Sequence, residues 1–235
     1  MSTSPQTPGS ERPGLFVAFE GADGSGKSTQ ARAVAEALRA RGRQVLLTRE
    51  PGGSDLSEAL RGLLLDPAHA PVDPRTEALL FAAARAAHVE RTVRPALAAG
   101  TVVLTDRYVD SSIAYQGAVR GLGAERIAEL NVWATQGLEP DLTVLLDVDA
   151  ATAAGRRAGR HTGTGQGPDR MEQETAAAHE TLRAAFRARA QAWPQRYLVL
   201  EAAAPAEALT EAVLTRLTAL EREPGGQPRS GGGRA

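Results

Sequence analysis

One glycine-rich stretch constrains this chain more than any other. The stretch GADGSGKSTQ (residues 21–30) follows a short apolar run and precedes an alanine-rich run with helical character. It fits the pattern G-x-x-x-x-G-K-[ST], with Gly21, Gly26, Lys27 and Ser28 at the fixed positions. Small residues let the backbone wrap closely, so that successive N–H groups and the start of the following helix face phosphate oxygens. The stretch therefore predicts a loop that binds ATP or GTP.

The residues of this loop have distinct expected roles. The ammonium group of Lys27 is compact enough to sit between phosphate oxygens, and Lys27 is the one lysine among 27 basic residues, the rest being arginine. The hydroxyl of Ser28 is expected to meet Mg²⁺. We expect the nucleotide to contact the whole loop, which comprises Gly21, Ala22, Asp23, Gly24, Ser25, Gly26, Lys27, Ser28 and Thr29.

Composition excludes several other classes of protein. The chain has no cysteine, which rules out disulfides, thiolate zinc sites and a cysteine nucleophile. A net charge of −1 gives no bulk attraction to nucleic acid or to a membrane surface. The N-terminal residues are polar, and no apolar run approaches the length that spans a bilayer. We expect a cytoplasmic protein with neither nucleic-acid nor membrane partners.

Apolar runs alternate with helical patterns along the chain. This alternation predicts an α/β fold with a five-stranded, mostly parallel sheet and helices on both faces. We expect one domain over residues 14–221, between a disordered extension (1–13) and a disordered glycine-rich tail (222–235). The expected strands are 14–20, 44–50, 101–106, 141–148 and 197–201, and the main later helices are 73–97, 124–136, 170–193 and 206–221.

Charged residues follow the expected strands at one edge of the sheet, where ligands of such folds bind. Asp106 ends an apolar strand, which is the usual place for a carboxylate that meets Mg²⁺ directly or through water. Arg107 and Arg49 lie at neighbouring strand ends, and guanidinium groups bind phosphate monoesters bidentately. Taken alone, each could also be an ordinary surface side chain beside a turn.

Two further segments are ambiguous when taken alone. Phe81 and Arg85 lie four residues apart and so share one helix face, where a ring and a donor fork could hold a base. A phenylalanine on such an alanine-rich helix is more often part of the core. The glycine-rich segment 156–170, with Arg156, Arg157 and Arg160, is either a mobile, closing lid or a disordered basic loop.

Together these features describe two anion sites, one for a nucleoside triphosphate and one for a monophosphate acceptor. The segments GLFVAFEGADGSGKSTQ, TREPGG, LLFAAAR, DRYVDSSIAYQG and DRMEQE occur in this order and resemble the thymidylate kinase family. The resemblance covers roughly residues 14–220. It implies the P-loop NTPase fold, with Mg²⁺ and ATP as cofactor and phosphoryl donor, and a homodimer.

The resemblance also implies a role for individual residues. Asp23 would lie near the acceptor sugar and phosphate, Phe81 would stack on thymine and Tyr115 would crowd the 2′ position, favouring deoxyribose. The complete dTMP set would be Asp23, Arg49, Phe81, Arg85, Arg107, Ser111, Ser112, Tyr115 and Gln116. In that set Arg49 and Arg107 hold the phosphate, Arg85 meets a base carbonyl, and Ser111, Ser112 and Gln116 line the base and sugar side.

The expected lid resembles that of the bacterial type of the family, in which lid arginines stabilise the transferring phosphate. Gly24 stands where some thymidylate kinases carry a basic residue in the P-loop, whereas the segment around 156–170 is rich in arginine. The segment HTGTGQGP is longer than the usual lid, so the resemblance leaves open whether Arg160 or Arg156 stabilises the transferring phosphate. The expected catalytic set is Lys27, Asp106, Arg107 and one or both of these arginines.

The expected reaction transfers the γ-phosphoryl group of ATP to dTMP, giving dTDP and ADP on the route to dTTP. Three other functions remain possible on the residues alone. One is a related kinase for another nucleotide or nucleoside, which Phe81, Arg85 and Tyr115 disfavour. A GTP switch is disfavoured because no N-K-x-D segment occurs. A nucleotide-binding scaffold without turnover is disfavoured by the intact Lys27, Ser28 and Asp106.

Overall fold

A computed structural model describes residues 14–156 and 176–222. In these residues five strands form one sheet in the order β2-β3-β1-β4-β5, and every neighbouring pair is parallel. The α/β prediction and the number of strands are confirmed, and the mostly parallel sheet is parallel throughout. The strands are β1 (Phe16–Glu20), β2 (Val45–Arg49), β3 (Val102–Asp106), β4 (Leu142–Asp147) and β5 (Tyr197–Glu201).

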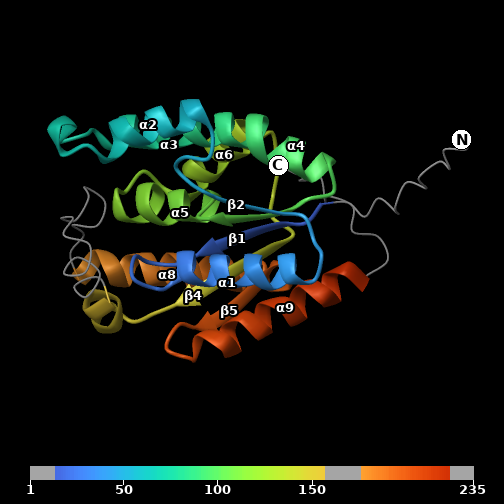
Figure 1. The fold of residues 1–235 in the computed structure, drawn as a ribbon. Helices are drawn as coiled ribbons and strands as arrows, with labels where there is room; N and C mark the ends of the chain where they lie inside the picture. The colour runs from blue at the N-terminus through green and yellow to red at the C-terminus, as the bar shows by residue number, and fades with distance from the viewer. Residues whose placement is uncertain (1–13, 157–175, 223–235) are drawn as a thin grey trace, which may run out of the picture.

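The central strand β1 is buried on both faces because its side chains alternate between two layers of helices. Val17 and Phe19 pack with helices α1 (Lys27–Ala40) and α9 (Ala206–Arg222). Phe16 and Ala18 pack on the opposite face. Figure 1 shows α1 crossing the middle of the sheet with α9 below it, and a second layer of helices above the sheet.

The second layer begins with a long helical path. Helix α3 (Pro74–His88) continues through a π-helical turn, η2 (Val89–Val93), into α4 (Arg94–Ala98). The sequence predicts one helix over this span, bent or ended by Pro95. The widened turn lies just before that proline, which lacks an N–H for the carbonyl four residues earlier and crowds it with its ring.

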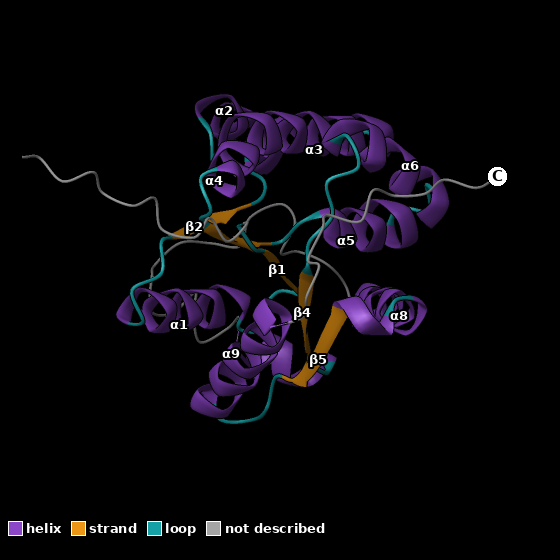
Figure 2. Cartoon of the chain, turned by 90° about the vertical axis from the view of Figure 1, so that its right-hand side faces the viewer, coloured by secondary structure: helices purple, strands orange, loops and turns teal. Residues whose placement is uncertain are grey.

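Four more helices complete this layer. Helix α5 (Val109–Ser112) passes directly into a second π-helical turn, η3 (Ile113–Val119). Helix α6 (Ala124–Thr135) packs against α3, and α2 (Asp55–Leu65) packs against α3 from the other side. Helix α8 (Ala176–Ala192) lies beside η3, β4 and β5 (Figure 2). Short 3-10 turns occupy η1 (Pro67–His69) and η4 (Pro194–Arg196).

Some boundaries differ from the sequence-based expectation. The sequence places Asp55 as the cap of α2, whereas the N-cap is Ser54, whose side chain accepts a hydrogen bond from Ser57 N, and Asp55 is the first helical residue. Arg222, assigned to the tail, ends α9. The expectations for the extension (1–13), for most of the lid and for the rest of the tail lie outside the described residues. Within the described ranges, no helix has the length and hydropathy needed to cross a membrane.

Candidate active site

The P-loop connects β1 to α1, and two of its glycines are required by its geometry. Gly21 and Gly24 have φ values of 137° and 87°, in the region that favours glycine. A Cβ atom at Gly21 would lie 2.5 Å from Leu146 O, and one at Gly24 would lie 2.5 Å from Ala153 O. The loop therefore packs against β4 and the segment after it so closely that side chains at these two positions would collide with backbone.

Lys27 lies over this loop, and its surroundings lower the pKa of its ammonium group. Its Nζ donates to Ala22 O at 2.9 Å, and the side chain is buried. Burial and the nearby charge of Arg107 lower the pKa of Lys27 to about 8. Burial alone would raise the pKa of Asp23, but the charges of Arg107 and Lys27 outweigh it and hold that pKa well below its usual value. The loop thus presents a cation beside an ionised carboxylate.

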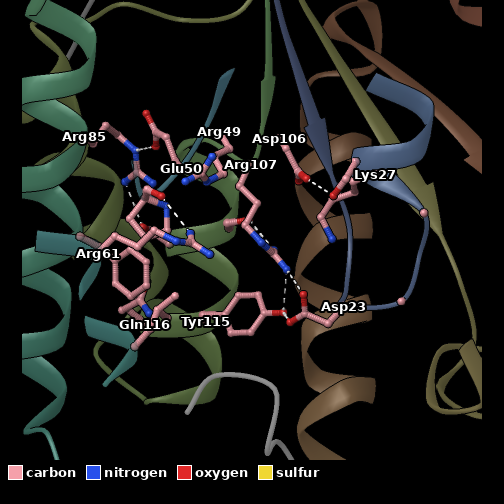
Figure 3. A pocket seen from close by; sticks show the side chains of 18 of the residues that line it. Asp23, Lys27, Arg49, Glu50, Arg61, Arg85, Asp106, Arg107, Tyr115 and Gln116 are labelled. Carbon is pink, nitrogen blue, oxygen red and sulfur yellow. Dashed lines mark hydrogen bonds and ion pairs between the residues drawn. The ribbon is translucent and has the colours of Figure 1, made fainter. Parts of the chain in front are cut away.

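One cavity of about 500 Å³ opens at the carboxyl ends of the strands, as the sequence predicts (Figure 3). Every residue of the predicted dTMP set lines it, as do Arg156 and Asp106. Gly21, Ala22 and Ser25 belong to the loop but do not line the cavity, and Arg160 lies outside the described residues. The predicted residues that line it are Asp23, Gly24, Gly26, Lys27, Ser28, Thr29, Arg49, Phe81, Arg85, Asp106, Arg107, Ser111, Ser112, Tyr115, Gln116 and Arg156.

The pair formed by Ser28 and Asp106 fits a magnesium ion. Ser28 Oγ donates to Asp106 Oδ2 across the cavity floor. The second oxygen, Asp106 Oδ1, is buried and has no hydrogen-bond partner among the described residues. Mg²⁺ in nucleotide sites takes one or two protein oxygens and completes its shell with phosphates and water. A hydroxyl and a carboxylate with an unused oxygen are suited to that role.

Arg107 lies at the centre of the cavity and is held from several sides. Its guanidinium donates to Asp23 Oδ1 at 2.5 Å, to Ser111 Oγ at 2.9 Å and to Gly21 O at 3.3 Å. The hydroxyl of Tyr115 donates to Asp23 Oδ2 at 2.9 Å, so Arg107 and Tyr115 converge on one carboxylate (Figure 3). The guanidinium carbon also lies 5.2 Å from the centroid of the Tyr115 ring. Arg107 is thereby fixed between the P-loop and the acceptor end.

The other two predicted arginines have partners of their own in the cavity wall. Arg49 pairs with Asp106 in the strand register, and its side chain donates to both oxygens of Glu58 at 2.9 Å. Arg156 donates to Ala202 O, just after β5, at 2.8 Å. Both side chains are largely exposed and therefore can reorient toward an anion.

Arg85 is far more buried than the sequence suggests, with a relative exposure of 2%. Its Nε donates to Glu50 Oε2 at 2.6 Å, and its terminal nitrogens donate to Ser112 Oγ, to Asn131 Oδ1 and to Tyr108 O. Burial alone would raise the pKa of Glu50, but the charge of Arg85 and a hydrogen bond from His88 lower it. Phe81, only partly buried, lies beside this network in the cavity wall.

Sequence reasoning missed three charged residues near the site. Glu20 ends β1, and its carboxylate accepts from Tyr108 N, Ser111 N and Ser111 Oγ at 2.6–3.2 Å. Burial and the neighbouring Asp110 raise the pKa of Glu20 to about 7. Glu50 and Arg61 also line the cavity. A charged residue at the end of a fully apolar strand was a signal for Glu20, whereas the burial of Glu50 has no local signature in the sequence.

Comparisons with known proteins agree on one family. The family profile of thymidylate kinase matches residues 19–213. A thymidylate kinase of Clavibacter michiganensis is 51% identical over 207 residues, covering 88% of this chain and 96% of the relative. A thymidylate kinase of Cutibacterium acnes is 47% identical, with 88% of this chain and 98% of the relative covered.

A solved structure leads to the same family. The crystal structure of thymidylate kinase from Ehrlichia chaffeensis superposes with a TM-score of 0.69 at 31% sequence identity. The superposition covers 88% of this chain and 99% of that one, so the P-loop NTPase fold is confirmed. With a family profile that spans most of the described residues and relatives near half identity, the chain belongs to the thymidylate kinase family.

Proposed function

We propose that this chain transfers the γ-phosphoryl group of ATP to dTMP, giving dTDP and ADP in nucleotide biosynthesis. The observation that carries the proposal is a single cavity with the P-loop at one end, Phe81 and Arg85 at the other, and Arg107 between them. Such an arrangement places two phosphate-bearing ligands end to end. An oxygen of the dTMP phosphate would attack the γ-phosphorus while the bond to the ADP oxygen breaks.

The donor end is formed by the P-loop and the end of β3. Lys27 and the loop backbone would bind the ATP phosphates, and Ser28 with Asp106 would hold Mg²⁺, which neutralises charge on the phosphates when bound. The acceptor phosphate is already ionised, so the transfer needs no strong base. Positioning and charge neutralisation by these side chains would account for the rate.

The acceptor end would hold dTMP by its phosphate and its base. Arg107 and a reoriented Arg49 would grip the phosphate, and Phe81 would stack on thymine. Asp23 and Tyr115, already joined by a hydrogen bond, would face the sugar, where the phenol ring would crowd a 2′-hydroxyl. Ser111, Ser112 and Gln116 complete this end of the cavity.

The remaining proposals concern the bounds of the kinase domain and the arginine that the lid supplies. We place the kinase domain at residues 14–221, with a lid at about 156–170 that supplies Arg156 or Arg160 to the transferring phosphate. Arg156 already lines the cavity from the helical segment 150–156. Single substitutions of Arg156 and Arg160 by alanine, measured as single-turnover rates, would identify the arginine that acts in the transfer.

Labelled ATP tests the proposed reaction. Purified protein with Mg²⁺, dTMP and ATP carrying a radioactive γ-phosphate should move the label into dTDP, separated by anion-exchange chromatography. Label released as inorganic phosphate, with none in dTDP, would contradict the proposal. Lys27→Ala is the matched negative variant, because it removes the P-loop cation.

We also propose that the chain forms a homodimer through helices α3 and α6. These two helices pack together and leave three large apolar side chains exposed, Leu79 at 58%, Val132 at 59% and Trp133 at 81%. Large apolar side chains gathered on neighbouring elements are typical of an interface. Light scattering after gel filtration should give twice the chain mass, and Trp133→Glu should give a monomer; a monomeric wild type would refute the interface.

A further inference from the structure

Gln116 in the cavity wall has an amide whose orientation is fixed from behind. Its Nε2 donates to Glu77 Oε1 at 2.9 Å, and both side chains are about 1% exposed. Arg120 Nε donates to the same Glu77 oxygen at 3.3 Å, so Glu77 is paired as a carboxylate. Glu77 itself does not line the cavity, whereas Gln116 does.

The hydrogen bond between the Glu77 carboxylate and the Gln116 amide determines which way the amide faces. A carboxylate only accepts hydrogen bonds, so the NH₂ group of Gln116 must be on the side of Glu77. Its oxygen is then on the other side of the amide, and it accepts no hydrogen bond from any residue that the structure describes. Gln116 therefore offers an acceptor where it borders the cavity.

Arg85 offers the complementary group in the same wall. A guanidinium has five N–H donors, and four of them are used by Glu50, Ser112, Asn131 and Tyr108 O. The fifth is on the terminal nitrogen that also bonds Tyr108 O, and it has no acceptor among the described residues. Because the other four bonds fix the guanidinium plane, this donor has a fixed direction.

We propose that Glu77 is a positioning residue that sets base selectivity by holding Gln116 as an acceptor in the cavity wall that also carries the donor of Arg85. This inference rests on the proposed function and concerns the pyrimidine subsite of that cavity. A base with a carbonyl at position 4 and a hydrogen on N3 matches an acceptor and a donor side by side. A base with an amino group at position 4 and no hydrogen on N3 would place a donor against the Arg85 donor and an acceptor against the Gln116 acceptor.

The test compares the dissociation constants of dTMP and dCMP by titration calorimetry. In Glu77→Gln the new amide can meet Gln116 with either its oxygen or its nitrogen, so the orientation of Gln116 is no longer fixed. We expect the ratio of the dCMP to the dTMP dissociation constant to fall about tenfold, the effect of one hydrogen bond. Loss of a merely structural contact would weaken the binding of both ligands equally.

Two further variants separate positioning from structural damage. Arg120→Met removes the ion pair of Glu77 but leaves its oxygen for Gln116, so the ratio should stay at the wild-type value. In a Gln116→Ala background, Glu77→Gln should no longer change the ratio, because Glu77 would act through an amide that is absent. Thermal unfolding of each variant checks that the chain is folded.

The outcomes distinguish this inference from the proposed function. An unchanged ratio in Glu77→Gln, or an equal change with and without Gln116, would overturn the role of Glu77. The binding ratio does not depend on turnover, so failure of phosphoryl transfer to dTMP would overturn the proposed function alone.

Discussion

Replacing Arg107 with alanine should reduce kcat/KM for dTMP by about 100-fold or more. One charge-assisted hydrogen bond to a phosphate contributes about 1.5–3 kcal/mol, which corresponds to roughly 10- to 150-fold. The guanidinium also neutralises Asp23, to which it donates at 2.5 Å. Without Arg107 that carboxylate would repel the phosphate in the cavity, which places the expected loss at the upper end of the range.

The backbone conformation of Arg107 allows a second substitution that distinguishes the loss of activity from an effect on stability. Its φ of 73° lies in the left-handed region, which costs a residue with a Cβ atom about 1 kcal/mol or more. Arg107→Gly relieves that strain and Arg107→Ala does not. Both variants should lose the same activity, while the glycine variant should be about 1 kcal/mol more stable than the alanine variant in urea denaturation.

The assay is a coupled measurement of ADP with dTMP varied at saturating ATP and Mg²⁺. Arg41→Ala is the matched control, because it removes an exposed arginine at the end of α1, remote from the cavity. The reasoning fails if Arg107→Ala retains kcat/KM within about threefold of wild type. It also fails in its account of strain if the glycine variant is the less stable of the two.

Three further predictions concern residues in the cavity wall or directly behind it. Because the pKa of Glu20 is raised from its ordinary 4.5 to about 7, the folded chain holds the proton more tightly than the unfolded chain. The stabilisation contributed by the protonated Glu20 is complete below pH 4.5 and is lost as the pH rises through 7. Between pH 5 and 7.5 the free energy of unfolding of the wild type should therefore fall by about 2 kcal/mol more than that of Glu20→Gln. Parallel stability curves would contradict this. Gly24→Ala should weaken ATP binding and lower the melting temperature, because its Cβ atom would lie 2.5 Å from Ala153 O; wild-type ATP affinity in calorimetry would count against the close packing. Asp106→Asn should raise the Mg²⁺ concentration needed for half-maximal activity, and an unchanged Mg²⁺ dependence would exclude Asp106 from the metal site.

The sequence predicted the fold well where hydrophobic periodicity decides it. All five strands lie within a few residues of their predicted positions, because each is a short apolar run bounded by glycine, proline or charge. The P-loop and the charged strand ends also lie together as predicted, since the carboxyl ends of parallel strands share one edge. Local patterns therefore locate the cavity without any knowledge of packing.

Features that depend on contacts between distant segments could not be read in this way. The segment 109–119 forms a helix with a π turn, and nothing in its local pattern distinguishes that path from a loop. Arg85 looks like a free donor on a helix face, yet all three of its nitrogens donate to partners that lie between 23 and 46 positions away in the sequence. The partners Glu50 and Glu77 are likewise identified by tertiary contacts alone.

The measurement that tests the central claim most directly is ADP formation with ATP, Mg²⁺ and a panel of nucleoside monophosphates. Our account predicts turnover confined largely to dTMP, with dUMP weaker because its base carries no methyl group to contact the cavity wall. Turnover with another acceptor and not with dTMP would keep a kinase but contradict the assignment of the Phe81, Arg85 and Tyr115 end of the cavity. No turnover with any acceptor would contradict the proposed reaction itself.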